Sequence, residues 1–317
     1  MKISVAMAVC CGEAFIDEQL SSLFAQTPVP DEIIICDDSP DDRMFQQLRP
    51  WLTKYPEVLR YVKNPETLGV SANFGKAISL TTGDIILLAD QDDFWLPGKI
   101  AALCNAITPE CQGSFCDSTL TDAELHPLGR THRQTRGFSR LELKKILSGN
   151  AGEFENTALK RFPAAGHNMA FSAAMKEKIL PIPELPECHD SWIGFTVMLH
   201  SRWAVVDEQL TLFRQHSDNT SRAGRYSALQ QAQLSASRNA ARWYAGLFQE
   251  LTARANGDVP EKYRARLHYS RQRGDLPELP LLRRISVIFR LLLNGSYFRF
   301  GRGFLTAAQD LLFTCKS

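Results

Sequence analysis

The first hundred residues alternate short apolar runs with stretches whose apolar residues recur at helical spacing. Four apolar runs read as buried strands, at Ile3–Val9, Ile33–Cys36, Val58–Val62 and Ile85–Ala89. The stretches after them predict helices over Phe15–Ala25, Asp42–Lys54, Val70–Leu80 and Pro97–Ile107. This order predicts an α/β domain with a Rossmann-like, mostly parallel sheet and helices on both faces.

The pattern is less regular from about residue 113 onward. Short strands are predicted at Ser114–Cys116, Ala170–Phe171, Trp203–Val206 and Leu210–Phe213, and helices at Leu141–Leu147 and Ile193–Leu199. Beyond Ser227 helix formers dominate, which predicts helices over 227–255 and 260–273. We therefore expect a first domain over residues 1–225 and a helical C-terminal extension over residues 226–317.

Composition places the chain among globular proteins and gives its tail a distinct charge. Of 317 residues, 44% are hydrophobic and 22% charged, enough to bury a sizeable core. The formal net charge of +1 argues against a nucleic-acid partner. Residues 281–317 hold six Arg or Lys and one acid, so 30 basic and 34 acidic residues remain before them. The tail is thus at +5 and the body at −4, which indicates an anionic partner surface for the tail.

The eight cysteines show no metal-ligand spacing and are interpreted as reduced thiols of a cytoplasmic protein. Met1-Lys2 leads directly into the first strand without a signal peptide, and no uninterrupted apolar run reaches the length of about 18 residues that a spanning helix needs. The expected location is the cytoplasm, with the inner face of the plasma membrane as the place of work if the tail binds lipid.

An acidic cluster follows the fourth apolar run. Asp90, Asp92 and Asp93 come where the strand over Ile85–Ala89 leaves the sheet. Carboxylates are costly to gather at an interior edge unless a cation holds them, and Mg²⁺ or Mn²⁺ prefers such oxygen ligands and bridges to phosphates. The cluster predicts a metal–diphosphate site at the end of a strand. An acidic loop capping the helix that begins at Pro97 explains it equally well.

Two further positions lie at strand ends or helix starts. Asp37-Asp38 ends the second run, where a carboxylate can accept hydrogen bonds from a base or a ribose; an Asx turn is the alternative. Gly69 precedes the third helix and would let the backbone approach a ligand, although an ordinary loop-to-helix junction also needs a glycine there. The chain has no GxGxxG after its first strand and no GxxxxGK[ST], which argues against dinucleotide dehydrogenases and P-loop enzymes.

Two polar segments of the second half complete the candidate chemistry. In His189-Asp190-Ser191-Trp192, Asp190 could take a proton from a hydroxyl and Trp192 could stack on a sugar; a helix N-cap is the alternative for Asp190. After two apolar runs comes the segment 214–221, in which Arg214 could contact phosphate and neutral His216 could bind the metal. A solvated loop would explain that segment as well.

In this order the motifs resemble those of the family 2 inverting glycosyltransferases, which have the GT-A fold. The resemblance covers roughly residues 1–225 and is closest to the rhamnosyltransferase-like branch of bacterial surface polysaccharide synthesis. The matching elements are Val5-Ala6-Met7, Gly12, Glu18-Gln19-Leu20-Ser21-Ser22-Leu23, Glu32-Ile33-Ile34-Ile35-Cys36-Asp37-Asp38-Ser39, Asn64, Leu68-Gly69-Val70, Asn73, Thr82-Gly83-Asp84, Ala89-Asp90-Gln91-Asp92-Asp93-Phe94-Trp95, His189-Asp190, Trp192, Arg214-Gln215-His216, Asn219 and Ser221.

The resemblance implies a transfer of a sugar, rhamnose being one candidate, from a nucleoside-diphosphate donor to a glycan or lipid-linked acceptor. Asp190 would be the general base, and the reaction would invert the anomeric centre without a covalent intermediate. Asp90 and Asp92 would form the D-x-D motif for Mg²⁺ or Mn²⁺, with Asp92 the direct ligand. The implied donor-binding residues are Ala8, Asp38, Gly69, Asn73, Asp90, Asp92 and Asp93; the acceptor-binding residues are His167, Asn168, His189 and Trp192; the metal-binding residues are Asp92, Asp90 and His216.

One departure from the family pattern keeps other interpretations open. Val9-Cys10-Cys11 stands where the family often has Thr or Ser followed by Tyr-Asn, so an aromatic side chain for the base is missing. A silent binding or assembly protein of the same fold, and a sugar nucleotidyltransferase, are therefore the alternatives. For the tail from 281, whose Leu, Ile and Phe alternate with Arg, an anionic membrane surface and packing on the body or on a second subunit remain equally open.

Overall fold

The computed structural model describes residues 1–185, 189–217 and 238–313. Among these, residues 1–154 and 163–217 form one compact unit, and residues 155–162 and 238–313 form another. The expected domain boundary after residue 225 lies outside the described residues. The sequence pattern did not indicate that residues 155–162 would belong with the C-terminal helices.

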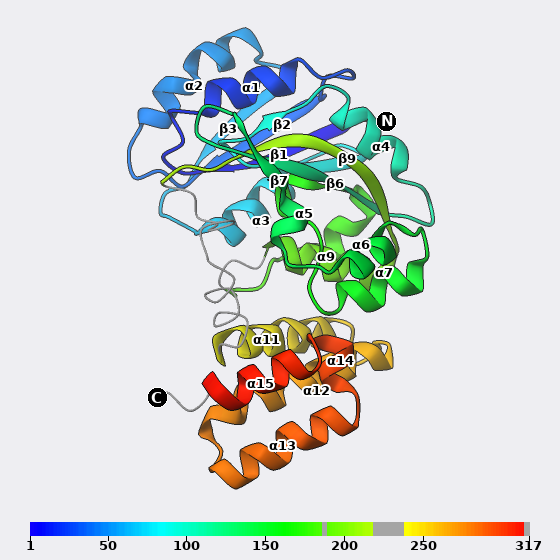
Figure 1. The fold of residues 1–317 in the computed structure, drawn as a ribbon. Helices are drawn as coiled ribbons and strands as arrows, with labels where there is room; N and C mark the ends of the chain where they lie inside the picture. Colours follow the sequence, from blue (N-terminus) through cyan, green and yellow to red (C-terminus); the bar gives the residue numbers. More distant parts are fainter. Residues whose placement is uncertain (186–188, 218–237, 314–317) are drawn as a thin grey trace. The chain divides into compact units, whose positions relative to one another are not determined.

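Nine strands of the first unit join in one sheet (Figure 1). The pairing order is β3-β2-β1-β4-β8-β6-β9-β5, with β7 paired to β6. Their bounds are β1 Ile3–Val9, β2 Glu32–Asp37, β3 Leu59–Lys63, β4 Ile85–Ala89, β5 Phe94–Trp95, β6 Gly113–Thr121, β7 Pro127–Thr131, β8 Met169–Ser172 and β9 Trp203–Arg214.

The first four strands along the chain, β1 to β4, form the parallel part of the sheet. β3, β2, β1 and β4 pair side by side in parallel, as expected from the strand–helix alternation of the sequence. Beyond them β8 pairs antiparallel with both β4 and β6, whereas β6 and β9 are parallel. The expected α/β fold, with its parallel sheet and flanking helices, is confirmed.

Helices cover both faces of the sheet, because its central strands are apolar on both sides (Figure 1). Alternate residues such as Val5 and Met7 face α1, α2 and α4, whereas Phe74 and Ala77 of α3 are buried on the other face, where α3 also packs on α9. The bounds of these helices are α1 Ile16–Phe24, α2 Arg43–Lys54, α3 Val70–Leu80, α4 Lys99–Ala106 and α9 His189–His200.

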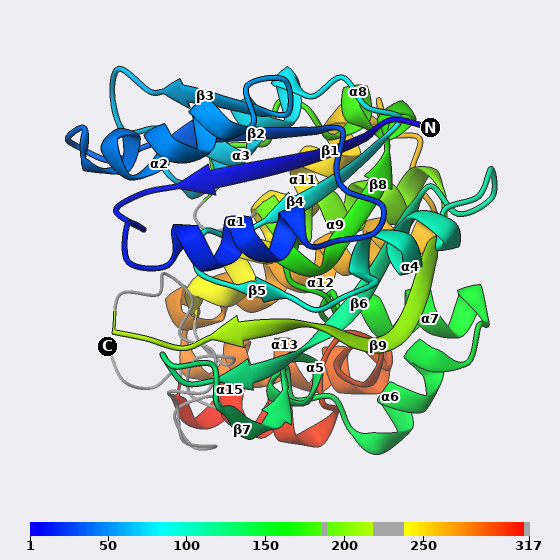
Figure 2. The ribbon, with the colours of Figure 1, turned by 90° about the horizontal axis from the view of Figure 1, so that it is seen from above.

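The second half of the unit differs from the expectation in the extent of its elements. The two short strands expected at 203–213 are one strand, β9, which runs beside β6 along most of its length (Figure 2). β6 continues past the expected Cys116 to Thr121, because its polar residues are buried between neighbouring strands rather than exposed. The remaining elements are α5 His132–Thr135, α6 Arg140–Leu147, α7 Ala151–Ala158, the 3₁₀ turns η1 Gly166–Asn168 and η2 Ala173–Met175, and α8 Lys176–Ile179.

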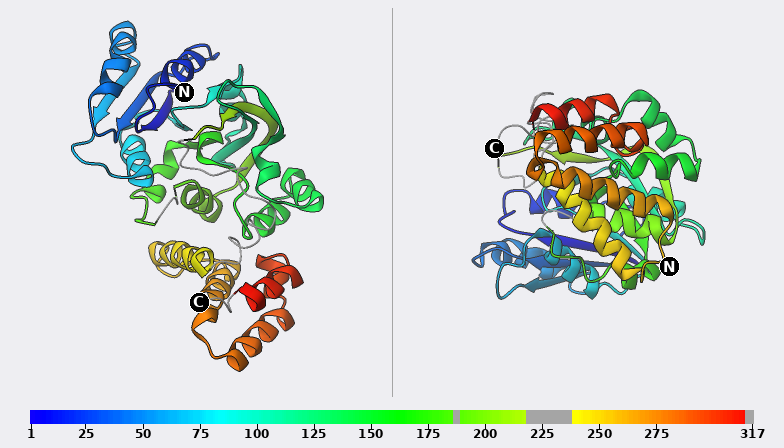
Figure 3. Two further views of the ribbon diagram at one scale, coloured as in Figure 1. Left: turned by 60° about the vertical axis from the view of Figure 1, so that its left-hand side comes forward. Right: turned by 90° about the horizontal axis from the view of Figure 1, so that it is seen from below.

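The second unit is helical, as expected for the C-terminal extension (Figure 3). Its helices are α11 Arg238–Arg254, α12 Glu261–Asp275, α13 Leu281–Leu293, α14 Ser296–Phe300 and α15 Phe304–Phe313, with the 3₁₀ turn η3 Leu276–Glu278 after α12. Across the described part of the chain, no helix is both long enough and apolar enough to cross a bilayer.

Candidate active site

The carboxyl ends of β1 and β2 are tied together by a buried amide–carboxylate network. Asp38 accepts hydrogen bonds from Asn64 Nδ2 at 2.6 Å and from the backbone N–H of Leu68 and Gly69 at 3.1 and 2.9 Å. Asn64 also donates to Asn73 Oδ1, and Asn73 donates to the Cys36 carbonyl at 2.9 Å. Asp38 therefore fixes the loop that leads into α3, and Asn73 fixes that helix against the end of β2.

Gly69 stands before α3 with a φ of 82°, a conformation that glycine adopts without strain. Its N–H points to Asp38, and a side chain at this position would meet no neighbouring atom. The backbone of Gly69 beside Asp38 is thus exposed, with open space around it.

The loop after β1 carries the departure from the family pattern. Cys10 and Cys11 are exposed, with their sulfur atoms 3.9 Å apart, and burial raises the pKa of Cys10 to about 11. Gln91 pairs with the backbone of Cys10 through two hydrogen bonds of 2.7 and 3.0 Å. The loop after β1 and the acidic segment after β4 are therefore joined side by side. Ala8, half-buried near the end of β1, precedes this contact.

Asp90 and Asp93 converge on His167 behind the end of β4. His167 Nδ1 lies 3.2 Å from Asp90 Oδ2 and 3.5 Å from Asp93 Oδ2. Burial opposes a charge on His167, but Asp93 and the hydrogen bond to Asp90 outweigh it and raise its pKa. Burial also opposes the charge of Asp90, yet His167 lowers the pKa of that carboxyl. The structure thus places His167 beside the carboxylates of the acidic cluster.

Asp93 is the least satisfied carboxylate of the cluster. It is fully buried, and its Oδ1 accepts only a 3.3 Å hydrogen bond from the Arg214 backbone, whereas its Oδ2 has no hydrogen-bond partner. Burial raises the pKa of Asp93 to about 7; the charge of His167 opposes this rise, and those of Asp92 and Asp90 add to it. A cation would relieve that cost.

Asp92 pairs with a second histidine, His216, which lies 124 positions later in the sequence. Its Oδ2 lies 2.9 Å from His216 Nε2, so the structure places these two residues side by side. The buried Arg214 just before them does not face outward as a phosphate contact would. Its guanidinium donates to the carbonyls of Asp92 and Ala123 and to Glu18, and lies 4.6 Å above the Phe15 ring.

Lys99, a buried lysine that the sequence pattern did not single out, contacts the residues around His167. Lys99 Nζ donates to the His167 carbonyl and to Thr211 Oγ1, both at 2.7 Å, and lies 3.8 Å from the Trp95 ring centre. Burial lowers its pKa to about 8. Lys99 begins an amphipathic helix, a position typical of exposed lysines, so no local sequence signal indicates its burial.

Asn168 belongs to the same network. Its side chain donates to Ser118 Oγ and accepts from Thr211 Oγ1, and Ser118 in turn contacts His167 Nε2 at 3.3 Å. Because His167 and Asn168 are almost wholly buried, their contacts point to holding the acidic cluster rather than to lining an open acceptor surface.

The start of α9 lies close to the acidic cluster. The His189 ring stacks on Phe74 of α3 at 4.4 Å, and a Cβ on Gly166 would come within 2.6 Å of His189 Nε2. Asp190 follows directly, half-buried, with Oδ1 accepting from the Ser191 N–H. The lack of a side chain at Gly166 therefore lets the start of α9 approach the end of β4, where His189 lowers the pKa of Asp90.

Trp192 is placed differently from the expectation. Its indole is fully buried, and its Nε1 donates to the Ile179 carbonyl at 2.7 Å. A ring that stacks on a sugar needs an open face, so this placement argues against an acceptor contact by Trp192. We correct that expectation: the tryptophan anchors α9 to α8.

The donor set fits a hard divalent cation. Asp90, Asp93 and His167 offer ligand atoms that all lie within 4.8 Å of one another, and Asp92, in the same acidic segment, pairs with His216, which follows β9. Among the described residues Asp93 Oδ2 receives no hydrogen bond, which favours a cation over a purely structural cluster.

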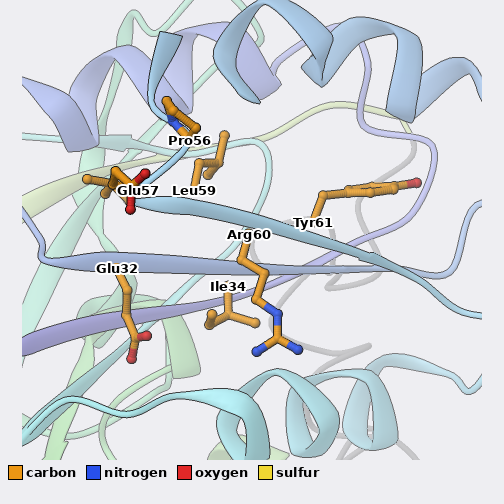
Figure 4. Close-up of a pocket in the computed structure, with 8 residues that line it drawn as sticks. Glu32, Ile34, Pro56, Glu57, Leu59, Arg60 and Tyr61 are labelled. Carbon is orange, nitrogen blue, oxygen red and sulfur yellow. The ribbon is translucent and has the colours of Figure 1, made fainter. Parts of the chain in front are cut away.

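A surface hollow elsewhere on the first unit does not contain these groups. Figure 4 shows this hollow of about 420 Å³ at the start of β2 and along the edge strand β3. Open parallel sheets bind ligands at the carboxyl ends of their strands, and the acidic cluster lies at that end. The hollow is lined by Glu32, Ile34, Pro56, Glu57, Val58, Leu59, Arg60 and Tyr61.

Comparison with known families decides the affiliation. The family model described as glycosyl transferase family 2 matches residues 4–180, more than half of the chain. The chain belongs to glycosyl transferase family 2. The matched residues of this family 2 chain include Asp38 and the acidic cluster at 90–93, whereas Asp190, Arg214 and His216 come after them.

Curated relatives of this family 2 protein match over shorter or more distant stretches. An uncharacterized protein of Mycobacterium tuberculosis is 33% identical over 84 residues, covering 26% of this chain and 24% of that protein. The chain thus spans about a quarter of that relative's length. The dTDP-rhamnosyl transferase RfbG of Shigella flexneri is 23% identical over 228 residues, covering 67% of this chain and 72% of RfbG.

Solved structures of glycosyltransferases share the fold. TarS residues 1–349 of S. aureus superpose with a TM-score of 0.60 at 15% identity, covering 98% of this chain and 91% of that one. The mannosyltransferase PcManGT of Pyrobaculum calidifontis, in complex with GDP-Man and Mn²⁺, gives a TM-score of 0.54 at 15% identity, covering 99% and 86%. At these identities the likeness shows the fold of this family 2 protein.

Proposed function

We propose that the chain is a metal-dependent, inverting glycosyltransferase that moves a sugar from a nucleoside-diphosphate donor to a glycan or lipid-linked acceptor. The observation that carries this proposal is the position of acidic groups at one edge of the sheet. β2 and β4 both pair in parallel with β1, so Asp38, which follows β2, and the cluster at 90–93, which follows β4, stand at the same edge. Asp190 begins α9, and the residue before it, His189, lies next to Gly166 and lowers the pKa of Asp90.

The donor end lies between Asp38 and the acidic cluster. Asp38, with the exposed backbone at Gly69, supplies hydrogen-bonding groups for the base or ribose, while Asn73 and Ala8 shape the wall beside them. A divalent cation, Mg²⁺ or Mn²⁺, would be held by Asp92, with Asp90 and His216 around it, and its charge would offset that of the buried Asp93 beside them. When bound it stabilises the negative charge of the departing diphosphate.

The acceptor end is assigned to Asp190. Asp190 is half-buried, and its Oδ1 accepts the Ser191 N–H; this carboxylate would accept a proton from an acceptor hydroxyl. The hydroxyl oxygen attacks the anomeric carbon from the side opposite the diphosphate, the bond to the diphosphate breaks, and the configuration inverts. His189, stacked on Phe74, fixes the start of the helix from which Asp190 extends.

The stereochemistry of the product tests the mechanism. We expect the anomeric configuration of the product, read by its proton–proton coupling in NMR, to be inverted relative to the donor. Retention would refute the single-displacement mechanism.

Replacing Asp190 by Asn should lower kcat by at least about a hundredfold with unchanged donor Kd, because only proton transfer is lost. Near-normal turnover of Asp190→Asn would rule out the base role.

The donor sugar is proposed from the relatives. The match to RfbG over two thirds of this chain favours a deoxythymidine-diphosphate rhamnose donor and a role in bacterial surface polysaccharide, such as O antigen. A thermal-shift panel of nucleotide sugars with Mn²⁺ tests this directly. Stabilisation by the rhamnose donor above the uridine and guanosine donors supports it, and a preference for another donor replaces it.

The same panel separates the alternatives. A sugar nucleotidyltransferase would be stabilised by nucleoside triphosphates, and a silent protein of this fold would show donor binding without transfer. The intact Asp38, Asp92 and Asp190 favour transfer over both. We further propose that the C-terminal unit brings the enzyme to its lipid-linked acceptor at the inner face of the membrane.

A further inference from the structure

Helix α13 of the second unit has two apolar faces, of which one is exposed. Ile288 and Leu291 are buried on the inner face. On the neighbouring face, residues spaced three or four apart stand out into solvent, with exposed fractions of 82%, 44%, 60% and 74% for Leu282, Ile285, Phe289 and Leu293. A helix that only packs on its own unit needs a single apolar stripe. The outer face of α13 therefore has a partner of its own.

The exposed apolar surface continues onto the two helices that follow. Phe298 of α14 and Phe304 of α15 touch edge to face, with ring centres 5.0 Å apart, and both are exposed. α14 and α15 pack with α13 in one helical unit. We call the exposed apolar residues of these three helices the outer surface: Leu281, Leu282, Ile285, Phe289, Leu293, Phe298, Phe304, Leu305, Leu311 and Leu312.

The charges that border the outer surface are all positive. Arg283 and Arg290 of α13 are exposed, as are Arg299 and Arg302 further along. The one acid between residues 281 and 312, Asp310, is buried and held by Arg273. Arg283 lies in the first turn of α13, where a positive charge interacts unfavourably with the helix dipole. That arginine therefore does not serve the stability of its helix.

These charges distinguish between the possible partners. Pairing of two copies through α13 would bring the arginines of both copies together without a carboxylate between them. An anionic bilayer offers negative headgroups to the arginines and hydrocarbon to the leucine and phenylalanine side chains. We infer that the outer surface of α13, α14 and α15 inserts into the interface of an anionic lipid bilayer.

This inference extends the proposed function, since it names which side chains enter the lipid. It is tested without donor or turnover, so its failure would leave the transferase assignment untouched. The full chain is sedimented with vesicles of phosphatidylcholine containing roughly a third phosphatidylglycerol, and with pure phosphatidylcholine vesicles, at low and high salt. We expect binding to the anionic vesicles that weakens with salt, and little binding to the neutral ones.

Two variants separate the apolar and the charged contribution. The triple variant Leu282→Gln, Phe289→Gln, Leu293→Gln should lower the partition coefficient by at least about a hundredfold, because three large apolar side chains leave the lipid. The double variant Arg283→Gln, Arg290→Gln should lower it about thirtyfold, since each basic residue near an anionic leaflet contributes a factor of roughly five.

A matched control uses exposed leucines of the first unit, Leu128→Gln, Leu141→Gln and Leu147→Gln, which should bind vesicles like the original chain. Circular dichroism checks that each variant keeps its helices, and the arginine variant decides if the triple variant unfolds. Equal binding to neutral and anionic vesicles, or unchanged binding of the arginine variant, overturns the inference. So does a dimer in analytical ultracentrifugation that the triple variant dissociates, without vesicle binding.

Discussion

Each unit of the molecule buries a carboxylate, and the two are treated in opposite ways. In the helical unit, Asp310 receives two hydrogen bonds of 2.6 Å from Arg273 and one of 2.7 Å from Tyr297. In the sheet unit, Asp93 has one long hydrogen bond and an oxygen without any. The Asp310 contacts raise the pKa of Arg273 despite its burial, whereas burial raises the pKa of Asp93 to about 7.

The difference separates a structural charge from a functional one. A buried ion pair with all its hydrogen bonds made holds its helices in place, and removing one partner is costly. A buried carboxylate without its full set of hydrogen bonds lowers the stability of the free protein. A bound cation would restore that stability. The difference supports the proposed cation site at the acidic cluster, whereas the Asp310 network holds the helical unit together.

The largest expected difference between Asp310 and Asp93 appears when each carboxylate is neutralised. Asp310→Asn should lower the free energy of unfolding of the helical unit by about 3–5 kcal/mol, because it leaves the Arg273 guanidinium buried without its partner. Asp93→Asn should change the free energy of unfolding by no more than about 1 kcal/mol, yet abolish most transfer activity. Urea unfolding with separate probes for the two units measures both. A loss at Asp93 as large as that at Asp310 would make Asp93 a structural residue.

A smaller effect is expected at the residue that holds the acidic segment from outside. Arg214→Lys keeps the charge but cannot reach the Asp92 carbonyl, the Ala123 carbonyl and Glu18 at once. It should cost about 1–3 kcal/mol in unfolding free energy, since a buried carbonyl is left unpaired. If Arg214 positions Asp92, the variant should also need a higher Mn²⁺ concentration for half-maximal thermal stabilisation. An unchanged Mn²⁺ midpoint would restrict Arg214 to a folding role.

The smallest effect concerns a carboxylate at the opposite end of the sheet. Glu32 begins β2 and accepts hydrogen bonds from Ser4, Thr82 and Gly83. Burial opposes its charge, but these hydrogen bonds lower its pKa. Stability from a lowered pKa is present above the unfolded value of about 4.3 and is lost as the pH falls through the folded value.

The original chain should therefore lose up to about 1 kcal/mol between pH 5 and pH 3 that a Glu32→Gln variant does not lose. Chemical denaturation of both chains across this range gives the difference. Identical pH profiles would show that Glu32 resembles neither of the two buried carboxylates and contributes no charge-dependent stability.

The sequence predicts the parallel half of the fold well, because local and global signals agree there. β4 is apolar at every position and β1 at every position but Ser4, and α1 and α3 have apolar residues at helical spacing, so each element is recognisable by itself. β6 and β9 carry polar residues that are satisfied only by neighbouring strands. Their lengths therefore could not be read from the local pattern.

The site shows the same division. Asp38 and Asp92 follow strands that the sequence reveals, so their place at the same edge of the sheet could be predicted. Lys99 and the buried state of His167 and Trp192 depend on packing between segments far apart along the chain. Trp192 was assigned to a sugar because its neighbours are polar, but the indole fills the space under α9. No pattern of three or four residues carries that information.

The span of the contacts at β9 has a consequence for how the protein forms. Arg214 reaches Glu18 across 196 positions of the sequence, and His216 reaches Asp92 across 124. Contacts of such long range form late, because a long loop must close first. A chain still emerging from the ribosome can therefore pair β1 with β4 long before the acidic segment receives its arginine and histidine. The capacity to bind a nucleotide diphosphate would then be among the last properties that the nascent chain acquires.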